Sequence, residues 1–354
     1  MRKSVVVVLL IAWLQTPAVA SPGALDSTPH DPDGADRAPA RGTPWIDLAP
    51  SKVLAMHEPS PTKRDHKVAS ALTLAGLYAA FSTWTYFAWY RKGCRKPPRA
   101  CTEFLWGLDG AFGAETYAGG ADKLGHAWST MGLARLGTEM LYQWGGYSRR
   151  GSIIVGAAMA DALFLAVEVR DGFTYEMSYW DFTFDTIGAA LAVALSAWPR
   201  LDELIDFRVQ YFPSTAYRAQ FKKGNVDVAE DYSGQTYLLA LHLGALPGLR
   251  DARWGGWSRY VDLAVGFETR GYKPDPPYVI DPEDPARPDY PHRQSLFLGL
   301  TLNAQGVFDR LLDRRSRPRK VTHAVFEVFN LPYTTLPVLE QTRHPHGPVA
   351  MDGA

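Results

Sequence analysis

Apolar side chains dominate four long stretches in the first part of the chain, and each is of helical length. Residues 69–90 carry no charge over 22 positions, about the length needed to cross a bilayer. Further helical stretches cover residues 124–144, 152–170 and 182–198, and Pro199 ends the last one. We predict about four principal helices, of which 69–90 is either a membrane helix or a buried core helix.

Small residues recur one helical turn apart in two of these stretches. Gly156 precedes Ala160 by four residues, and Gly188 precedes Ala192 by four. Such pairs let two helix backbones approach closely, in a membrane or in a tight soluble bundle.

The pattern changes beyond Pro213. Apolar and other residues alternate over 261–268 and 296–302, as expected for strands with one buried face. We also expect a third strand at 324–329 and one more helix at 231–243. A loop rich in proline and aspartate, residues 273–291, separates the first two strands.

These elements predict a mainly α fold: a helical bundle, either membrane-embedded or soluble, followed by a smaller mixed α/β carboxy-terminal region. The expected parts are a signal peptide at 1–20, a disordered linker at 21–66, the bundle at 67–212, the mixed region at 213–340 and a disordered tail at 341–354.

The start of the chain indicates export. Arg2 and Lys3 precede the uncharged run 4–14, and Ala-Val-Ala at 18–20 supplies a cleavage pattern before Ser21. We therefore expect a periplasmic or cell-envelope protein that is associated with a membrane. The residue directly after the predicted cleavage point is Ser21 and not a cysteine, so amino-terminal lipidation is not supported.

Two cysteines, Cys94 and Cys101, lie in a basic segment. An exported compartment is oxidising, so we predict a short disulfide between them; two free thiols are the less favoured alternative. The basic flank at 91–99 would be cytoplasmic by the positive-inside tendency, whereas a disulfide requires the exported side. The two inferences conflict.

Composition excludes some functions. The 37 basic and 37 acidic residues cancel, which argues against an extended surface for nucleic acid. Neither a phosphate-binding glycine loop nor a G-x-S-x-G nucleophile turn is present. A mean hydropathy of −0.17 is too low for a chain made mostly of membrane spans.

Ionisable side chains recur within the apolar helical stretches. At helical spacing, Asp122 can pair with His126, Glu168 with Asp171, and Asp181 with Asp185. Burying such groups alone is costly, so we expect them to converge. The predicted polar cluster comprises Asp122, Lys123, His126, Asp161, Glu168, Asp171, Ser178, Asp181 and Asp185.

The order of these residues resembles a known family. The motifs are D-K-x-x-H at Asp122, Lys123 and His126; E-x-x-D-G at Glu168, Asp171 and Gly172; and S-x-x-D-x-x-x-D-x-x-G at Ser178, Asp181, Asp185 and Gly188. They resemble the uncharacterised YfiM-like family of predicted periplasmic lipoproteins and, more distantly, the membrane-embedded VanZ-like proteins. The chain departs from the family in lacking a lipidation cysteine and in having Asp185 where asparagine is expected. The resemblance implies no enzymatic activity.

The cluster has a structural interpretation and a chemical one. In the first, His126 bonds Asp122 or Glu168, Lys123 neutralises Glu168 or Asp171, Gly172 follows a helix end, and Ser178 caps the next helix. In the second, Asp122, His126, Glu168 and Asp185 bind a divalent metal such as zinc, manganese or iron.

Two functions follow. The favoured one is a non-enzymatic binding or structural role in the envelope, with a membrane or envelope lipid as partner and an envelope protein or cell-wall polymer as alternatives. The other is a metal-dependent hydrolase of an envelope lipid or polymer, with His126 or Glu168 as general base.

Overall fold

The computed structural model describes residues 66–91, 103–114, 116–252, 255–273, 292–312 and 317–344. The chain separates into two units, Met1–Asp47 and Leu48–Ala354, and all described residues belong to the second. The predicted signal peptide, nearly all of the predicted linker and the cysteines Cys94 and Cys101 lie outside the described residues, as does most of the loop at 273–291.

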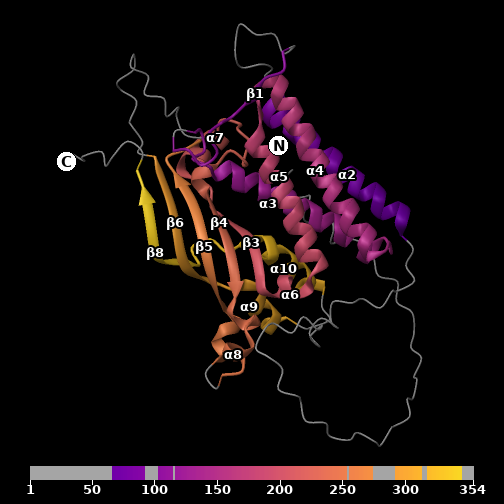
Figure 1. The fold of residues 1–354 in the computed structure, drawn as a ribbon, viewed down its shortest axis with the longest axis vertical. Coiled ribbons are helices and arrows are strands. Elements are labelled where there is room, and N and C mark those ends of the chain that lie inside the picture. Colours follow the sequence, from indigo (N-terminus) through magenta and orange to yellow (C-terminus); the bar gives the residue numbers. More distant parts are fainter. Residues whose placement is uncertain are drawn as a thin grey trace, which may run out of the picture. The chain divides into compact units, whose positions relative to one another are not determined.

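Four long helices form one layer of the fold (Figure 1). Two of them, α2 and α3, continue into π-helical turns, at Tyr86–Tyr90 and Met140–Trp144. The helices are α2 (Lys67–Thr85), α3 (Ala121–Glu139), α4 (Arg149–Thr174) and α5 (Tyr179–Ala197). All four stretches predicted as principal helices are helical.

Small residues set how closely these helices pack. A Cβ on Gly156 of α4 would lie 2.7 Å from the carbonyl oxygen of Ala134 on α3, and one on Gly188 of α5 would overlap the carbonyl of Ala127. Ala160 and Ala192 are buried. The close helix approach predicted from the two small-residue pairs is therefore confirmed.

A six-stranded sheet forms the second layer, in the order β7-β3-β4-β5-β6-β8. Only the β3–β7 pair is parallel. The strands are β3 (Ile205–Tyr211), β4 (Gln235–His242), β5 (Val261–Arg270), β6 (Arg293–Leu302), β7 (Phe329–Asn330) and β8 (Thr335–Arg343). A separate two-stranded parallel sheet joins β1 (Trp106–Gly107) to β2 (Met177–Ser178). The shorter helices are α6 (Pro199–Leu204), α7 (Thr215–Phe221), α8 (Pro247–Arg250), α9 (Ala304–Leu311) and α10 (Arg317–Val328).

The helix α3 joins the two layers. It packs on α4 and α5 on one side and contacts β3, β4 and β5 on the other. Its Trp128 donates a hydrogen bond to the carbonyl of Val328, and Tyr237 of β4 lies against Gly125. The mixed carboxy-terminal region is thus built directly on the helical layer.

The alternating stretches at 261–268 and 296–302 are strands, as predicted. The helix predicted at 231–243 is wrong, because residues 235–242 form β4. This strand pairs with β3 and β5, and most of it is buried on both faces. Because both faces are buried, its sequence lacks the alternation of apolar and polar residues that predicts a strand. The strand predicted at 324–329 is also wrong, because α10 runs to Val328 and Phe326 stacks on Phe308 of α9. β8 extends to Arg343, three residues into the predicted tail.

A buried ionic network crosses the sheet. Arg208 of β3 lies 2.7 Å from Asp206 and 2.9 Å from Asp262 of β5. Between these acids, His242 of β4 has its Nε2 2.9 Å from Asp206 and its Nδ1 3.0 Å from Asp262, and Asn303 donates to Asp262. Two acids therefore enclose two bases, which links three neighbouring strands.

This network perturbs the ionisation of its histidine. Burial lowers the pKa of His242, but the hydrogen bonds and charges of Asp206 and Asp262 outweigh that effect and raise the pKa to about 9. The protonated imidazolium is therefore the form that the sheet stabilises.

Replacing Gly188 by alanine should lower the free energy of unfolding by about 1–3 kcal/mol, because the new methyl meets backbone that cannot rotate away. The matched control is Gly132→Ala on α3, where an added Cβ has no neighbour within 4 Å; it should be neutral or stabilise by up to about 1 kcal/mol. Thermal unfolding of the purified variants measures both. Equal stabilities for the two variants would contradict the close approach.

The sheet should lose stability in alkali through His242. Because the folded pKa lies above the unfolded value, the contribution is complete below about pH 6.5 and disappears as the pH rises through about 9. The loss is on the order of 3 kcal/mol. Denaturant unfolding between pH 6 and 10 should show this decline in the natural protein and a flatter profile in His242→Gln. The control His323→Gln changes a part-exposed histidine of α10 and should keep the decline.

Candidate functional site

The predicted polar cluster forms where α3, α4 and α5 meet. Asp122, Lys123 and His126 come from the first two turns of α3, Glu168 from α4, and Asp181 and Asp185 from α5. All but His126 are buried. Residues separated by up to 63 positions therefore converge in one interior site, which the structure divides into two groups of side chains.

The first group surrounds the ammonium of Lys123 and is called the lysine group. Its Nζ lies 2.7 Å from Asp122 Oδ2 and 2.5 Å from Asp181 Oδ1, and it also contacts Asp109. Tyr117 donates a 2.7 Å hydrogen bond to Asp122 Oδ2. Three carboxylates thus enclose one cation, and a loop, α3 and α5 are linked through it.

The second group, called the histidine group, consists of His126, Glu168 and Asp185. His126 Nδ1 lies 3.1 and 3.2 Å from the two carboxylate oxygens of Asp185 and 3.8 Å from Glu168 Oε1. Thr130 donates a 2.8 Å hydrogen bond to Asp185. One ligand atom from each member lies within 4.8 Å of the others.

Glu168 uses only one of its two oxygens. Its Oε2 accepts a 3.2 Å hydrogen bond from the backbone N–H of Ser178, whereas its Oε1 is buried and finds no hydrogen-bond partner among the described residues. Asp122 Oδ1 of the lysine group is likewise buried and finds no hydrogen-bond partner among the described residues. Across both groups, five carboxyl groups face two basic side chains, so the site is short of positive charge.

The pairs predicted from helical spacing do not form as expected. Asp122 binds Lys123 instead of His126, and His126 binds Asp185 instead of Asp122. The nearest partner of His126 is Asp185 on the adjacent helix α5, and the nearest partners of Asp122 are the next residue, Lys123, and Tyr117 before α3. Lys123 neutralises Asp109, Asp122 and Asp181, not Glu168 or Asp171 as predicted.

Two of the predicted members interact elsewhere. Asp161 is half-buried and accepts a 3.4 Å hydrogen bond from Thr186 of α5. Asp171 bonds the hydroxyl of Tyr90. The helix end predicted at Gly172 is wrong, since α4 continues to Thr174 and the ring of Phe104 covers the glycine.

Ser178 caps α5, as predicted. Its hydroxyl accepts a hydrogen bond from the N–H of Asp181. The reciprocal half of a capping box is missing, because the Asp181 carboxylate turns to Lys123 and the Ser178 N–H donates to Glu168. The cap therefore also orients the acid of α4.

Sequence reasoning missed Asp109, which lies in a loop without a helical period that would relate it to Lys123. It also missed the ionic network of the sheet. A signal was present there, since Asp206 and Arg208 are two residues apart in an otherwise apolar stretch and therefore share one face of a strand.

Residues 109–197 match the model of a family described as predicted periplasmic lipoprotein (DUF2279). No curated protein and no solved structure matches the chain. The matched residues run from the acid of the loop to the end of α5 and contain both groups of the cluster. Similarity to a predicted periplasmic lipoprotein family, which the motif order suggested, is thus confirmed for this part of the chain. The family's description agrees with the predicted signal peptide, and the protein is an exported one of the periplasm or cell envelope.

Proposed function

We propose that this is a non-enzymatic protein of the cell envelope whose helical layer is embedded in a membrane, with the polar cluster holding its helices in register. The observation that carries the proposal is the outer face of the helical layer, which is exposed and almost free of charge. The resemblance to the membrane-embedded VanZ-like proteins points the same way.

The outer face of α4 is apolar along its length. Ile154, Val155, Leu165 and Val169 are exposed. Among the described residues, α4 is the helix long and apolar enough to cross a membrane, and only 44% of its most apolar stretch is buried. A core helix of a soluble protein would be covered, so this exposed apolar surface indicates another apolar phase.

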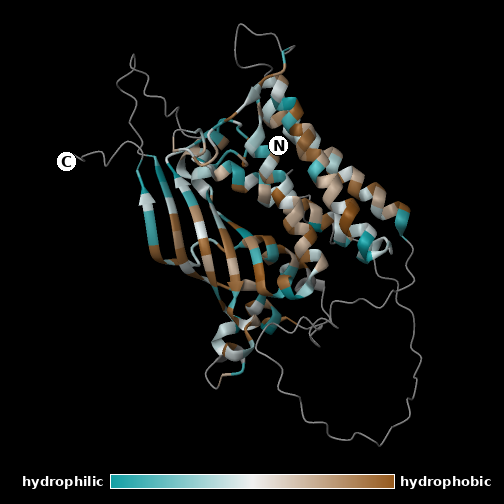
Figure 2. Cartoon of the chain, in the orientation of Figure 1, coloured by the Kyte–Doolittle hydropathy of each residue, from teal (hydrophilic) through white to brown (hydrophobic). Residues whose placement is uncertain are grey.

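The outer face of α2 continues this surface. Val68 and Leu72 near its start and Tyr86 and Phe87 after its end are exposed, and no charged residue occurs between Lys67 and Arg91. Figure 2 shows α2 and α4 largely brown or pale along their length. Between Arg150 and Glu168 of α4, the one charged residue is half-buried Asp161, which accepts a hydrogen bond from Thr186 of α5.

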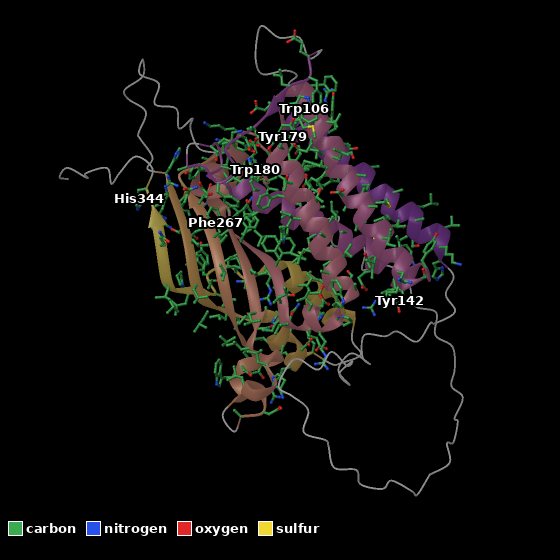
Figure 3. The ribbon with its side chains drawn as sticks, viewed as in Figure 1. Trp106, Tyr142, Tyr179, Trp180, Phe267 and His344 are labelled. Atoms are coloured by element: carbon green, nitrogen blue, oxygen red, sulfur yellow. The ribbon has the colours of Figure 1, made fainter. Side chains whose placement is uncertain are left out.

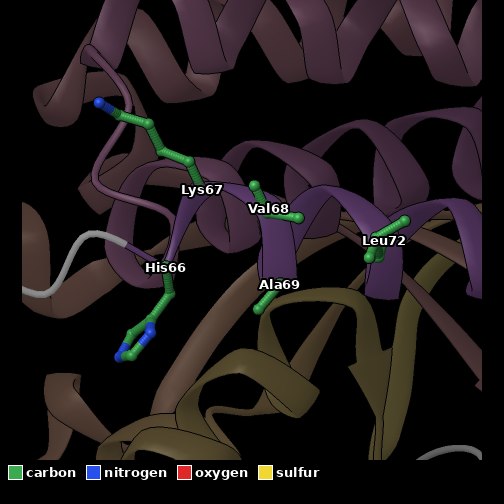
Figure 4. Close-up of a pocket in the computed structure, with 5 residues that line it drawn as sticks. All are labelled: His66, Lys67, Val68, Ala69 and Leu72. Carbon is green, nitrogen blue, oxygen red and sulfur yellow. The ribbon is translucent and has the colours of Figure 1, made fainter.

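The ends of the helical layer carry the residues expected at a membrane surface. Trp106 stacks on Tyr179 at a ring distance of 5.1 Å, and Figure 3 shows both beside Trp180 at one end of the layer, with Tyr142 toward the other. Figure 4 shows the start of α2, where Val68, Ala69 and Leu72 line a pocket together with His66 and Lys67.

The 26 residues of α4 extend over about 39 Å, enough for the hydrocarbon and part of the interface.

The sheet offers a second surface for a partner. Leu239, Val265, Leu298 and Leu339 are register neighbours on four adjacent strands and are all exposed. This row of apolar residues suits an envelope protein or a lipid. A cell-wall polymer is the less suitable partner, because it has little apolar surface.

A metal-dependent hydrolase is the second candidate. The histidine group favours it, since an imidazole and two carboxylates are the ligands of many catalytic zinc and iron centres.

Membrane extraction tests the proposal. The full chain, expressed with its own signal, should stay in the membrane pellet after alkaline carbonate and enter solution only with detergent. The double variant Val155→Glu, Leu165→Glu should be released by carbonate to a large extent, because each acid in the hydrocarbon costs about 2–3 kcal/mol.

Leu311→Glu is the matched control. Leu311 on α9 is 71% exposed, more than either Val155 or Leu165, yet it lies outside the helical layer and its change should leave the protein in the pellet. Release of the unaltered protein by carbonate without detergent would overturn the membrane assignment.

A further inference from the structure

We propose that His126, Glu168 and Asp185 bind one divalent transition-metal ion of the zinc, manganese or iron(II) class, which links α3, α4 and α5. The inference goes beyond the membrane role proposed above and does not depend on it.

The spacing of the histidine group suits such an ion. Zinc bonds nitrogen and oxygen at about 2.0–2.2 Å, so neighbouring ligands of a tetrahedral ion lie about 3.4 Å apart. His126 Nδ1 is 3.1 Å from the nearer oxygen of Asp185 and 3.8 Å from Glu168 Oε1. These two separations bracket the tetrahedral value, and the ligand atoms of Glu168 and Asp185 lie within 4.8 Å of each other.

Glu168 supplies independent support. Its side chain is 1% exposed, and the oxygen nearer to His126 has no hydrogen-bond partner among the described residues. Leaving a carboxylate oxygen buried and unpaired costs folding free energy. An ion between Glu168, His126 and Asp185 would satisfy that oxygen with the charge that the site lacks.

The surrounding contacts already orient the ligands. Thr130 holds Asp185, and the Ser178 N–H holds the other oxygen of Glu168. Such outer contacts fix ligand geometry in known metal centres. The His126 side chain is 20% exposed, so the group is not fully enclosed by the protein.

The lysine group explains why the ion would choose the histidine group. Asp109, Asp122 and Asp181 also have oxygens within 4.8 Å of one another, but the ammonium of Lys123 already lies among them. The acids of the lysine group thus already enclose an ammonium, whereas the acids of the histidine group face only an imidazole, which can itself serve as a metal ligand. A mixed nitrogen and oxygen ligand set further favours a transition metal over calcium.

The test is a zinc titration of the full mature protein, purified in detergent and stripped with a chelator. Isothermal titration and elemental analysis after gel filtration should give one zinc per chain, and zinc should raise the thermal unfolding temperature, because an ion that links three helices binds only the folded state. Absence of stoichiometric zinc from the folded natural protein would overturn the proposal.

Variants locate the ion. Glu168→Gln and His126→Gln should each weaken zinc binding at least 10-fold and abolish the zinc-dependent rise in unfolding temperature. Asp161→Asn, on the same face of α4 but outside the two groups, should keep both. Unchanged zinc affinity in folded Glu168→Gln and His126→Gln would place the ion elsewhere and refute the site. Carbonate extraction tests the membrane proposal independently, so a negative zinc titration would refute the metal site and not the membrane proposal.

Discussion

The ammonium of Lys123 and its three carboxylates form the contact on which the helical layer depends. A buried lysine without partners would be expelled or neutralised, and here Asp122, Asp181 and Asp109 each supply an oxygen. The three acids come from α3, from α5 and from the loop before α3. The ion group can therefore form only when the three segments are correctly placed, which gives register and specificity more than net stability.

Close backbone contact makes that arrangement possible. Gly156 and Gly188 let α4 and α5 touch the backbone of α3, which brings side chains as short as aspartate within bonding distance across the helix interfaces. Larger residues at these two positions would separate the helices, and both groups of the cluster would lose their geometry. The geometry of the ionic cluster therefore depends on the small-residue pairs.

The two polar interiors of the molecule differ in their balance of charge. In the sheet, Asp206 and Asp262 face Arg208 and His242, so acids and bases are equal in number and each makes at least one ion pair. In the helical layer, acids outnumber bases, and Glu168 and Asp122 each have an oxygen with no hydrogen-bond partner in the part of the chain that the structure describes. The excess of acids in the helical layer is the charge that the metal ion proposed for the histidine group would offset.

The sequence by itself determined the four helices, the two alternating strands and most of the residues of the cluster. Helical period, small-residue spacing and isolated charges in apolar stretches are local properties that can be recognised in the sequence alone. The family match over 109–197 agrees with the motif order. Ser178 as a cap was visible for the same reason, since a cap is set by residues three positions apart.

Tertiary structure alone decided the partners. Asp109 joins Lys123, and Asp122 and His126 pair with different residues despite sharing a helix face, because the nearest opposite charge is set by how separate helices meet. Packing also decided that residues 235–242 form a strand and not a helix. A central strand is identified by its neighbours, here β3 and β5, and not by its own apolar run. Local sequence encodes period and burial, whereas pairing over long separations depends on packing that no window of sequence contains.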